Sequence, residues 1–314
     1  MAFSFGDDWR YYEAMSAILT AYLPAAAAET CLLRNQQRVR IGRGSECDWC
    51  LDHPSISRVH AEILRDGDAW RLHDSGSKNG CFVEGTRTID AKLDQPTWLR
   101  LGDIPCEFTP LDTQAAQRIE QRATRRRQSS VTLAGRIAQH TALPDVLDET
   151  LRSVVELAEC ERGFILLNGP DGLRVRSCHG LGMDELRTRR FAGSMGAAMK
   201  SLTTGKAVVH NGVAADADLA QRESVLDAGL RALVCLPLKI GDAVVGVVYA
   251  DSRGSGSTIT ALDLELLVAF VERAALWMEA RRGQEILAGV SAAQLGKATP
   301  GSFASLVMEG QNDP

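Results

Sequence analysis

The sequence predicts a multidomain protein in which an all-β sandwich is followed by an α+β domain, an antiparallel sheet flanked by helices. Between residues 38 and 108, short segments alternate apolar and polar residues, as half-buried strands do. Beyond residue 131, amphipathic helical patterns alternate with nearly continuous apolar strands. The 314 residues suffice for two domains, each with its own core.

The N-terminal segment carries apolar residues at helical spacing after an acidic start. These residues are Trp9, Tyr12, Met15, Ile18, Leu19 and Tyr22. The spacing predicts one amphipathic helix over residues 7–23, ended by Pro24 and the alanines that follow. Residues 1–28 are therefore expected to form an N-terminal helical segment that packs on its own domain, with a partner surface as the alternative.

A β-sandwich is predicted over residues 29–112. The expected strands lie, in order, at 29–35, 38–41, 60–64, 69–73, 98–103 and 106–108. Asp66, Gly67 and Asp68 separate the two alternating segments in the middle of this list, which predicts a hairpin there.

Three polar signatures interrupt these strands at loop positions. They are Gly42-Arg43, Ser57-Arg58-Val59-His60 and Ser77-Lys78-Asn79-Gly80. Loops held by a rigid sheet are where binding groups are usually found. The signatures offer cations, hydroxyls and an amide, which suit a phosphate monoester because it is doubly charged and rich in acceptor oxygens. No set of acid, base and nucleophile stands out, and ordinary surface loops are the alternative interpretation.

In this order and spacing, the signatures resemble those of forkhead-associated (FHA) domains, β-sandwiches that bind phosphothreonine peptides through loops at one end. The resemblance implies that Arg43 and Ser57 contact the phosphate and that Asn79 holds the peptide main chain. It places Arg58 and Lys78 at flanking positions. Structural roles are implied for four further residues, namely Gly42, His60, Ser77 and Gly80, with His60 buried and bracing the serine loop.

The chain departs from the FHA pattern at two positions. Cys81 stands where the family usually has threonine, and Glu84 stands where it often has asparagine. Neither position is implied to touch phosphate, so the expectation of binding is retained.

Residues 113–130 are polar and basic and contain neither glycine nor proline, which predicts a basic linker that is helical or partly ordered. Arg126-Arg127-Gln128-Ser129 resembles a basophilic kinase site, flanked by Thr124 and Thr132. A phosphorylated threonine there could bind the sandwich in cis or from a neighbouring subunit. A solvent-facing linker is the simpler interpretation.

The pattern changes in residues 131–282. The expected elements are a helix at 143–157, strands at 163–167 and 173–177 around a turn, two central strands at 232–238 and 243–250, and a closing helix at 262–282. The closing helix has an apolar stripe from Leu262 to Trp277 that predicts a core face first and a dimer face second.

Three stretches of this region, ECERGFILL, AADADLAQRESVLDAGLRALVCLPL and GDAVVGVVYADS, resemble GAF domains of bacterial signalling proteins that also carry FHA domains. The resemblance implies pairing through terminal helices, hence a homodimer, and a small ligand held over the sheet in some members. No cofactor is expected. Cys178-His179 lies at the end of a strand, so bilin attachment is not supported, and the spacing of Cys160, Cys178 and Cys235 does not support a thiol reductase.

Residues 283–314 contain several glycines and prolines, which predicts a flexible C-terminal tail. No Walker loop is present, so an ATPase output domain is not expected within this sequence.

Composition excludes several classes of protein. The net charge of −5 argues against general nucleic-acid binding, and no apolar run is long enough to span a membrane. The acidic N-terminus is unlike a signal peptide, so a cytoplasmic protein with its eight cysteines reduced is expected. Cys47 and Cys50 form a lone C-x-x-C, which is weak evidence for a metal, and none is expected.

The sequence therefore predicts a non-enzymatic bacterial signalling adaptor that binds phosphothreonine partners of a Ser/Thr kinase pathway, with a GAF domain for small-molecule sensing or dimerisation. The alternative is a ligand-gated regulatory subunit, dominated by the GAF pocket, that acts in transcriptional control with a separate output partner.

Overall fold

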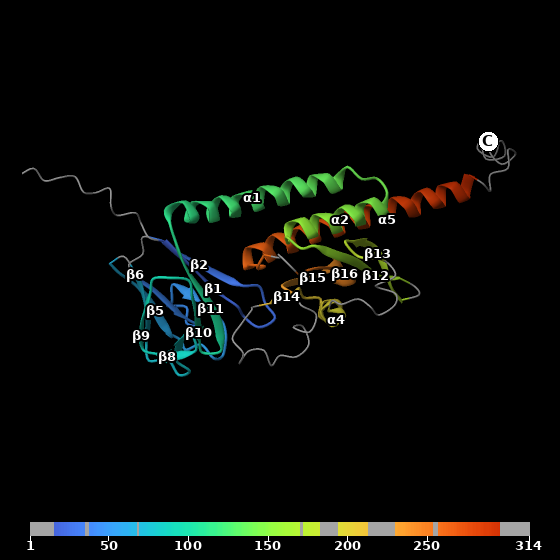
Figure 1. Ribbon diagram of the computed structural model, residues 1–314. Coiled ribbons are helices and arrows are strands. Elements are labelled where there is room, and N and C mark those ends of the chain that lie inside the picture. The colour runs from blue at the N-terminus through green and yellow to red at the C-terminus, as the bar shows by residue number, and fades with distance from the viewer. Residues whose placement is uncertain are drawn as a thin grey trace, which may run out of the picture.

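The structure is a computed structural model, and it describes residues 16–34, 38–67, 69–169, 172–182, 194–212, 230–253 and 257–295. Two facing sheets form the N-terminal part of the described chain, and a third sheet with helices on both faces forms the rest (Figure 1). The predicted fold class, a β-sandwich followed by an α+β domain, is confirmed.

The sandwich consists of a six-stranded and a five-stranded sheet with the orders β2-β1-β11-β10-β7-β8 and β4-β3-β5-β6-β9. The strands are β1 (Ser16–Ala21), β2 (Glu29–Leu33), β3 (Arg38–Gly42), β4 (Trp49–Cys50), β5 (Ala61–Asp66), β6 (Ala69–Asp74), β7 (Cys81–Val83), β8 (Thr86–Thr88), β9 (Asp90–Leu93), β10 (Thr97–Leu101) and β11 (Ile104–Leu111). Alternate side chains such as Leu19, Ile41, Leu72 and Phe108 are fully buried in one core. Such alternation is what two packed antiparallel sheets require.

Strand β1 corrects the prediction of a helix over residues 7–23. Residues 7–15 lie outside the described residues, but residues 16–21 pair with β11 on one side and β2 on the other. Ala17, Leu19 and Ala21 are fully buried at a period of two. The side chains of Ala17 and Ala21 are too small to mark the period of two clearly in the sequence. Pairing with neighbouring strands overrides the helical spacing of the larger apolar residues. Residues 29–35, where the sequence places the first strand, contain β2 instead.

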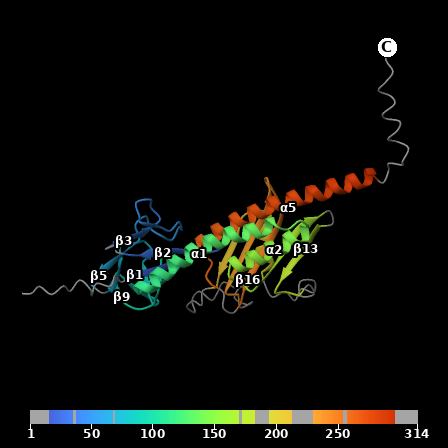
Figure 2. The same ribbon diagram turned by 90° about the horizontal axis from the view of Figure 1, so that it is seen from above.

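The second domain is built on an antiparallel sheet with the order β13-β12-β16-β15-β14. Its elements are α1 (Thr113–Ala138), α2 (Leu143–Leu157), β12 (Arg162–Gly169), β13 (Gly172–His179), α4 (Met195–Thr204), β14 (Val208–Asn211), β15 (Ala232–Ile240), β16 (Ala243–Ser252) and α5 (Ala261–Leu295). Helices α1, α2 and α5 share a core on one face of the sheet (Figures 1 and 2). Helix α4 packs on the other face (Figure 1). The expectation that β15 and β16 are central and covered on both faces is confirmed.

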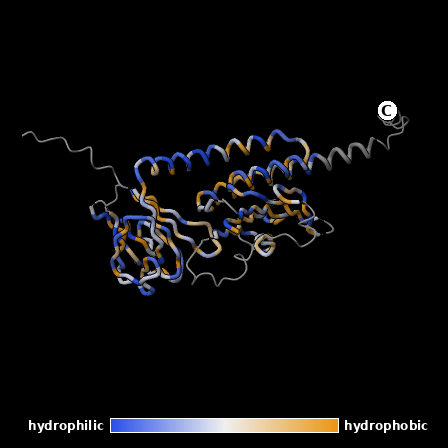
Figure 3. Tube along the Cα trace, viewed as in Figure 1, coloured by the Kyte–Doolittle hydropathy of each residue, from blue (hydrophilic) through white to orange (hydrophobic). Residues whose placement is uncertain are grey.

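Two helices run past the boundaries that the sequence indicated. Helix α1 continues across residue 130, and its first half is hydrophilic while its end supplies Leu133 and Ile137 to the core (Figure 3). Helix α5 extends to Leu295, so the predicted flexible tail is wrong for residues 283–295. Residues 296–314 lie outside the described residues. Within the described chain, no helix is both long and apolar enough to cross a membrane.

The loop between β1 and β2 joins the two domains. The Ala28 N–H donates to the Ile259 carbonyl at 2.9 Å, and the Ala261 N–H donates back to the Ala28 carbonyl at 2.9 Å. Ala27 is buried in the core under α5. The sandwich is therefore held to the start of α5 by main-chain bonds as well as by the continuous helix α1.

Candidate functional site

The three sequence signatures meet at one end of the sandwich. Arg43 follows β3, and its N–H donates to the Ser57 carbonyl at 3.0 Å. The Lys78 N–H donates to Ser57 Oγ at 3.0 Å, and Asn79 Nδ2 donates to the Ser55 carbonyl at 2.8 Å. The structure therefore brings Arg43, Ser57, Lys78 and Asn79 together on neighbouring loops. We call this surface, with Arg58, the rim.

His60 braces the rim from below. It is fully buried, its Nδ1 accepts the Ser57 N–H at 3.0 Å, and its Nε2 donates to the Gly80 carbonyl at 3.2 Å. Because a backbone N–H faces Nδ1, the ring is neutral with its proton on Nε2. Burial lowers the pKa of His60 and favours the same state. The imidazole therefore ties the serine loop to the loop that carries Asn79.

Asp74 organises the Asn79 loop and was missed by the sequence analysis. Its carboxylate accepts the Ser77 N–H at 2.7 Å, the Ser77 hydroxyl at 3.1 Å and the Cys81 N–H at 3.1 Å. Burial acts to raise the pKa of Asp74, but the hydrogen bonds from Ser77 and Cys81 outweigh it and hold the pKa below its usual range. An aspartate followed three residues later by serine at a turn was the available signal.

Both signature glycines are required by the backbone. A Cβ at position 42 would lie 2.1 Å from the Arg58 carbonyl oxygen, so any side chain there would separate two loops of the rim. Gly80 has a φ of +81°, in the left-handed region that favours glycine. These positions shape the rim and do not present functional groups.

The cations of the rim lack internal counter-ions. Arg43, Arg58 and Lys78 are exposed, and their side chains form no hydrogen bond or ion pair with any residue that the structure describes. Elsewhere on the sandwich, Arg71 pairs with Asp90 and Lys92 pairs with Asp94. Three uncompensated positive side chains around a fixed serine make an arrangement that suits a multiply charged anion.

The C-x-x-C cysteines brace the two arginines. Cys47 Sγ donates to the Arg58 carbonyl at 3.0 Å, and Cys50 Sγ donates to the Arg43 carbonyl at 3.6 Å. Among the described residues, no group of three histidine, cysteine, aspartate or glutamate side chains could hold a metal ion. The spacing of the two cysteines was visible in the sequence, but their contact with the rim depends on the fold.

Arg87 is a further cation near the rim that no sequence signal marked. The β7–β8 hairpin brings its Nε to 2.7 Å from the point that a Cβ on Gly80 would occupy. The side chain is exposed and forms no ion pair within the described part of the chain. It therefore adds positive charge beside Asn79.

The GAF-like sheet carries a buried polar network on its α4 face. Asp251 is fully buried, accepts Arg162 Nε at 2.5 Å and accepts the Tyr249 hydroxyl at 2.5 Å. The Tyr249 ring stacks on Phe164 with centroids 4.6 Å apart. The carboxylate is satisfied by these donors, which gives the network a structural explanation.

The cysteines considered for enzyme chemistry lie in surroundings that disfavour a thiolate. Burial raises the pKa of Cys160 to about 12, and it raises the pKa values of Cys178 and Cys235 as well. A protonated thiol is a poor nucleophile. The geometry gives no support to a thiol reductase.

Comparisons with known proteins separate the chain into the same two parts. The FHA domain family matches residues 39–104, and the GAF domain family matches residues 142–277. The oxoglutarate dehydrogenase inhibitor of Corynebacterium jeikeium is 31% identical over 93 residues, which cover 30% of this chain and 64% of that protein. Human kanadaptin is 42% identical over 57 residues, which cover 15% of this chain and 8% of that protein. The chain thus spans less than two thirds of each of these relatives.

Solved structures are similar to each part. An FHA domain from Chlamydia trachomatis is 26% identical, covers 30% of this chain and 96% of its own, and has a TM-score of 0.28. An FHA domain from a study of phosphothreonine-dependent FHA interactions is 29% identical, covers 29% of this chain and 95% of its own, and has a TM-score of 0.27. A GAF domain from Pseudomonas syringae pv. tomato is 18% identical, covers 55% of this chain and 98% of its own, and has a TM-score of 0.40.

Proposed function

Because the chain carries an FHA domain followed by a GAF domain, we propose that it is a non-enzymatic signalling adaptor that binds phosphothreonine in partner proteins through the rim. The observation that carries the proposal is the group of three exposed cations, without internal counter-ions, around the fixed Ser57. The proposal assigns the phosphate to Arg43 and Ser57, with Arg58 and Lys78 flanking it. Charge-assisted hydrogen bonds to the phosphate would supply most of the affinity.

Asn79 has a separate task in this proposal. One N–H of its amide is used on the Ser55 carbonyl, which fixes the side chain. The amide oxygen and the second N–H would bind the main chain of the peptide. The cationic side chains of the rim would then bind the phosphate, and the Asn79 amide would bind the peptide backbone.

A binding role also agrees with one relative. The similar protein from Corynebacterium is named an inhibitor of an enzyme, which supports regulation through contact with another protein. The cognate partner would be phosphorylated by a Ser/Thr kinase, and we place the encounter in the cytoplasm.

Calorimetry with a phosphothreonine peptide library tests this function. A hydrogen bond to a charged group is worth about 1.5 to 3 kcal/mol, so Arg43→Ala should weaken binding by roughly tenfold or more. Arg65→Ala is the matched control, because Arg65 is a partly exposed arginine at the other end of β5. Equal affinity of wild type and Arg43→Ala, or equal affinity for the unphosphorylated peptides, would contradict the proposal.

For the GAF domain we propose homodimerisation, small-molecule sensing or both. Helix α5 is 35 residues long, and Leu276 is 65% exposed on its outer surface. An exposed leucine on a long helix is a feature of helix-paired dimers. Sedimentation of wild type and Leu276→Glu measures the oligomeric state. If both proteins sediment as monomers, the proposed homodimer is contradicted.

The second candidate function is a ligand-gated regulatory subunit that acts with a separate output partner. His210 favours it, since its buried Nε2 has no hydrogen-bond partner in the described residues. The sheet register aligns His210 with Leu233 and Leu233 with Asp251, so His210 shares the α4 face with the polar network. Native mass spectrometry for a retained small molecule distinguishes this function from the adaptor.

A further inference from the structure

A groove lies between the β1–β2 loop of the sandwich and one side of α5. One wall is formed by Ala27 of the β1–β2 loop and by Glu29, the first residue of β2. The other is formed by Ala261, Leu264 and Val268 of α5. Its volume is about 530 Å³ and it is open to solvent. The wall residues on α5 recur every three or four positions, so they form one helix face about three turns long.

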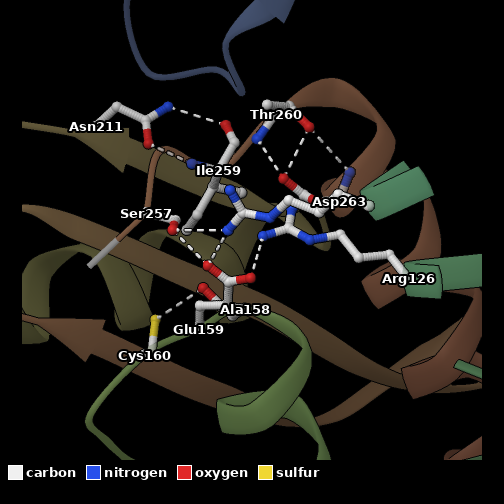
Figure 4. Close-up of polar contacts among 10 residues, drawn as sticks. Arg126, Ala158, Glu159, Cys160, Asn211, Ser257, Ile259, Thr260 and Asp263 are labelled. Atoms are coloured by element: carbon white, nitrogen blue, oxygen red, sulfur yellow. Dashed lines mark hydrogen bonds and ion pairs between the residues drawn. The ribbon is translucent and has the colours of Figure 1, made fainter. Parts of the chain in front are cut away.

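The walls of the groove are held in place by the joint between the domains. The Ala28 main chain is bonded to Ile259 and Ala261, on the same short loop that forms one wall. Behind α5, Arg126 of α1 pairs with Asp263 and, at 2.7 Å, with Glu159, while Asp263 also accepts the Thr260 N–H at 2.9 Å (Figure 4). The groove is therefore formed before any partner arrives, which lowers the entropic cost of docking.

The groove is acidic as well as apolar. Glu29, Glu265 and Glu272 line it, no basic residue does, and none of the three forms an ion pair within the described residues. Glu265 and Glu272 are seven residues apart, about 10 Å along the helix axis and on the same face. This contrasts with Glu159 and Asp263 behind the helix, which are both paired.

We infer that this groove is a second docking surface, independent of phosphothreonine, for a cationic amphipathic helix of a partner protein. Apolar side chains of that helix fill the space over Ala261, Leu264 and Val268. Lysine or arginine residues spaced by about seven pair with Glu265 and Glu272, as at the flanking positions of a coiled coil. The choice of a basic partner rests on charge complementarity, since all the charged groups of the groove are negative.

Fluorescence anisotropy on the full chain tests the surface. The probe is a labelled helical peptide of leucine and lysine only, with leucines at heptad positions a and d. Wild type should bind it about fivefold or more tightly than the double variant Glu265→Gln, Glu272→Gln, because two partly exposed ion pairs are lost. Glu279→Gln is the control, since Glu279 is exposed on α5 outside the groove. Photo-crosslinking of the peptide to Leu264 or Val268 should accompany binding.

Three outcomes would overturn the inference. The double variant could bind as tightly as wild type, or a scrambled peptide of the same composition could bind as tightly as the helical one. The third outcome is that the double variant dissociates a homodimer, which would make a second copy of this chain the occupant. Binding of phosphothreonine peptides is measured in parallel, so that a loss of helix binding at the groove can be distinguished from a loss of phosphopeptide binding at the rim.

Discussion

Ser57 illustrates how the site depends on single residues. Its N–H is taken by His60 Nδ1, its carbonyl by the Arg43 N–H and its hydroxyl oxygen by the Lys78 N–H. Every acceptor and donor except the hydroxyl proton is therefore engaged. The serine is positioned by all three signatures at once, and only its O–H remains to reach a bound anion.

His60 makes the stability of the sandwich dependent on pH. Burial lowers its folded-state pKa below the ordinary value of 6.5, so the unfolded chain binds a proton more readily than the folded one. Its contribution to stability is complete above about pH 6.5 and is lost as pH falls from there through the folded pKa. Urea unfolding at pH 7.5 and at pH values below 6.5 should show a smaller free energy of unfolding in acid.

The matched comparison for this prediction is a second histidine. His73→Gln, at an exposed position on β6, should retain the pH dependence of the wild type, whereas His60→Gln should reduce it. Equal unfolding free energies of wild type at both pH values would contradict the role given to His60.

Arg87 should contribute to phosphopeptide binding although it belongs to no signature. Its guanidinium lies against Gly80, beside Asn79, without a carboxylate partner in the described residues. Arg87→Ala should weaken binding by about two- to fivefold, the size expected for an exposed charge interaction, and the loss should shrink in high salt. Lys92→Ala, which removes a cation already paired with Asp94, should leave the affinity unchanged. Titration by anisotropy measures both.

At the scale of residues, order and spacing were sufficient to predict which loops would meet at the rim. Arg43, Ser57, Lys78 and Asn79 are brought together, although their contacts with a phosphopeptide stay a prediction. The sequence did not predict that Asp74, Cys47, Cys50 and Arg87 would lie at the rim. Their importance comes from which backbone atoms of distant segments lie next to them, and no local pattern contains that information.

At the scale of elements, strongly patterned segments were predicted well and weakly patterned ones were not. The apolar strands β15 and β16 and the amphipathic helix α2 lie where expected. The sequence predicts a helix where β1 lies because the inward alanines are small, and helix α1 continues across residue 130, where the sequence places the end of the linker. Pairing and packing with distant segments decided both cases.

The helical state of α1 also bears on phosphorylation within it. Thr124, Ser129 and Thr132 all lie inside the helix, and the Thr132 hydroxyl donates to the Gln128 carbonyl at 3.1 Å. Binding of a phosphothreonine from this segment in cis would require the helix to unwind locally. The structure therefore favours the interpretation of this segment as a rigid connector.

Arg126 should be the residue on which the packing of α1 against α5 most depends. It pairs with Asp263, whose side chain is only 3% exposed, and with Glu159. Arg126→Met would leave a buried carboxylate with only its Thr260 hydrogen bonds, at a cost of about 2 to 3 kcal/mol. Arg125→Met, at the exposed neighbouring position, should change the unfolding free energy by less than about 0.5 kcal/mol. Chemical denaturation of the two variants is the measurement.

At the scale of the whole molecule, the two domains should unfold together. Main-chain hydrogen bonds join Ala28 to α5, Ala27 is buried in the second core, and α1 is anchored to the sandwich by Arg34, which donates to the Ala116 carbonyl at 3.1 Å. Calorimetry of wild type should show one cooperative transition. Ala28→Pro removes one of the bridging N–H groups and should divide the transition into two.

A change in the same loop that leaves the bridge intact is the control. Ala25 has a φ of +55°, so Ala25→Gly relieves a left-handed backbone and should preserve a single transition at an equal or higher midpoint. Two transitions in the wild type would show that the joint is weaker than its contacts suggest.

The joint between the domains also determines where the polypeptide can be cut. A fragment starting at residue 131 would lose Arg126, leaving Asp263 and Glu159 without that cation, and would lose the Ala27 methyl group from the core under α5. A fragment ending at residue 130 would retain the sandwich but would expose Ala27 and the β1–β2 loop, which are covered by the start of α5 in the whole chain. Each fragment would expose surface that the other part of the chain covers, so cutting the chain near residue 130 should yield aggregation-prone products.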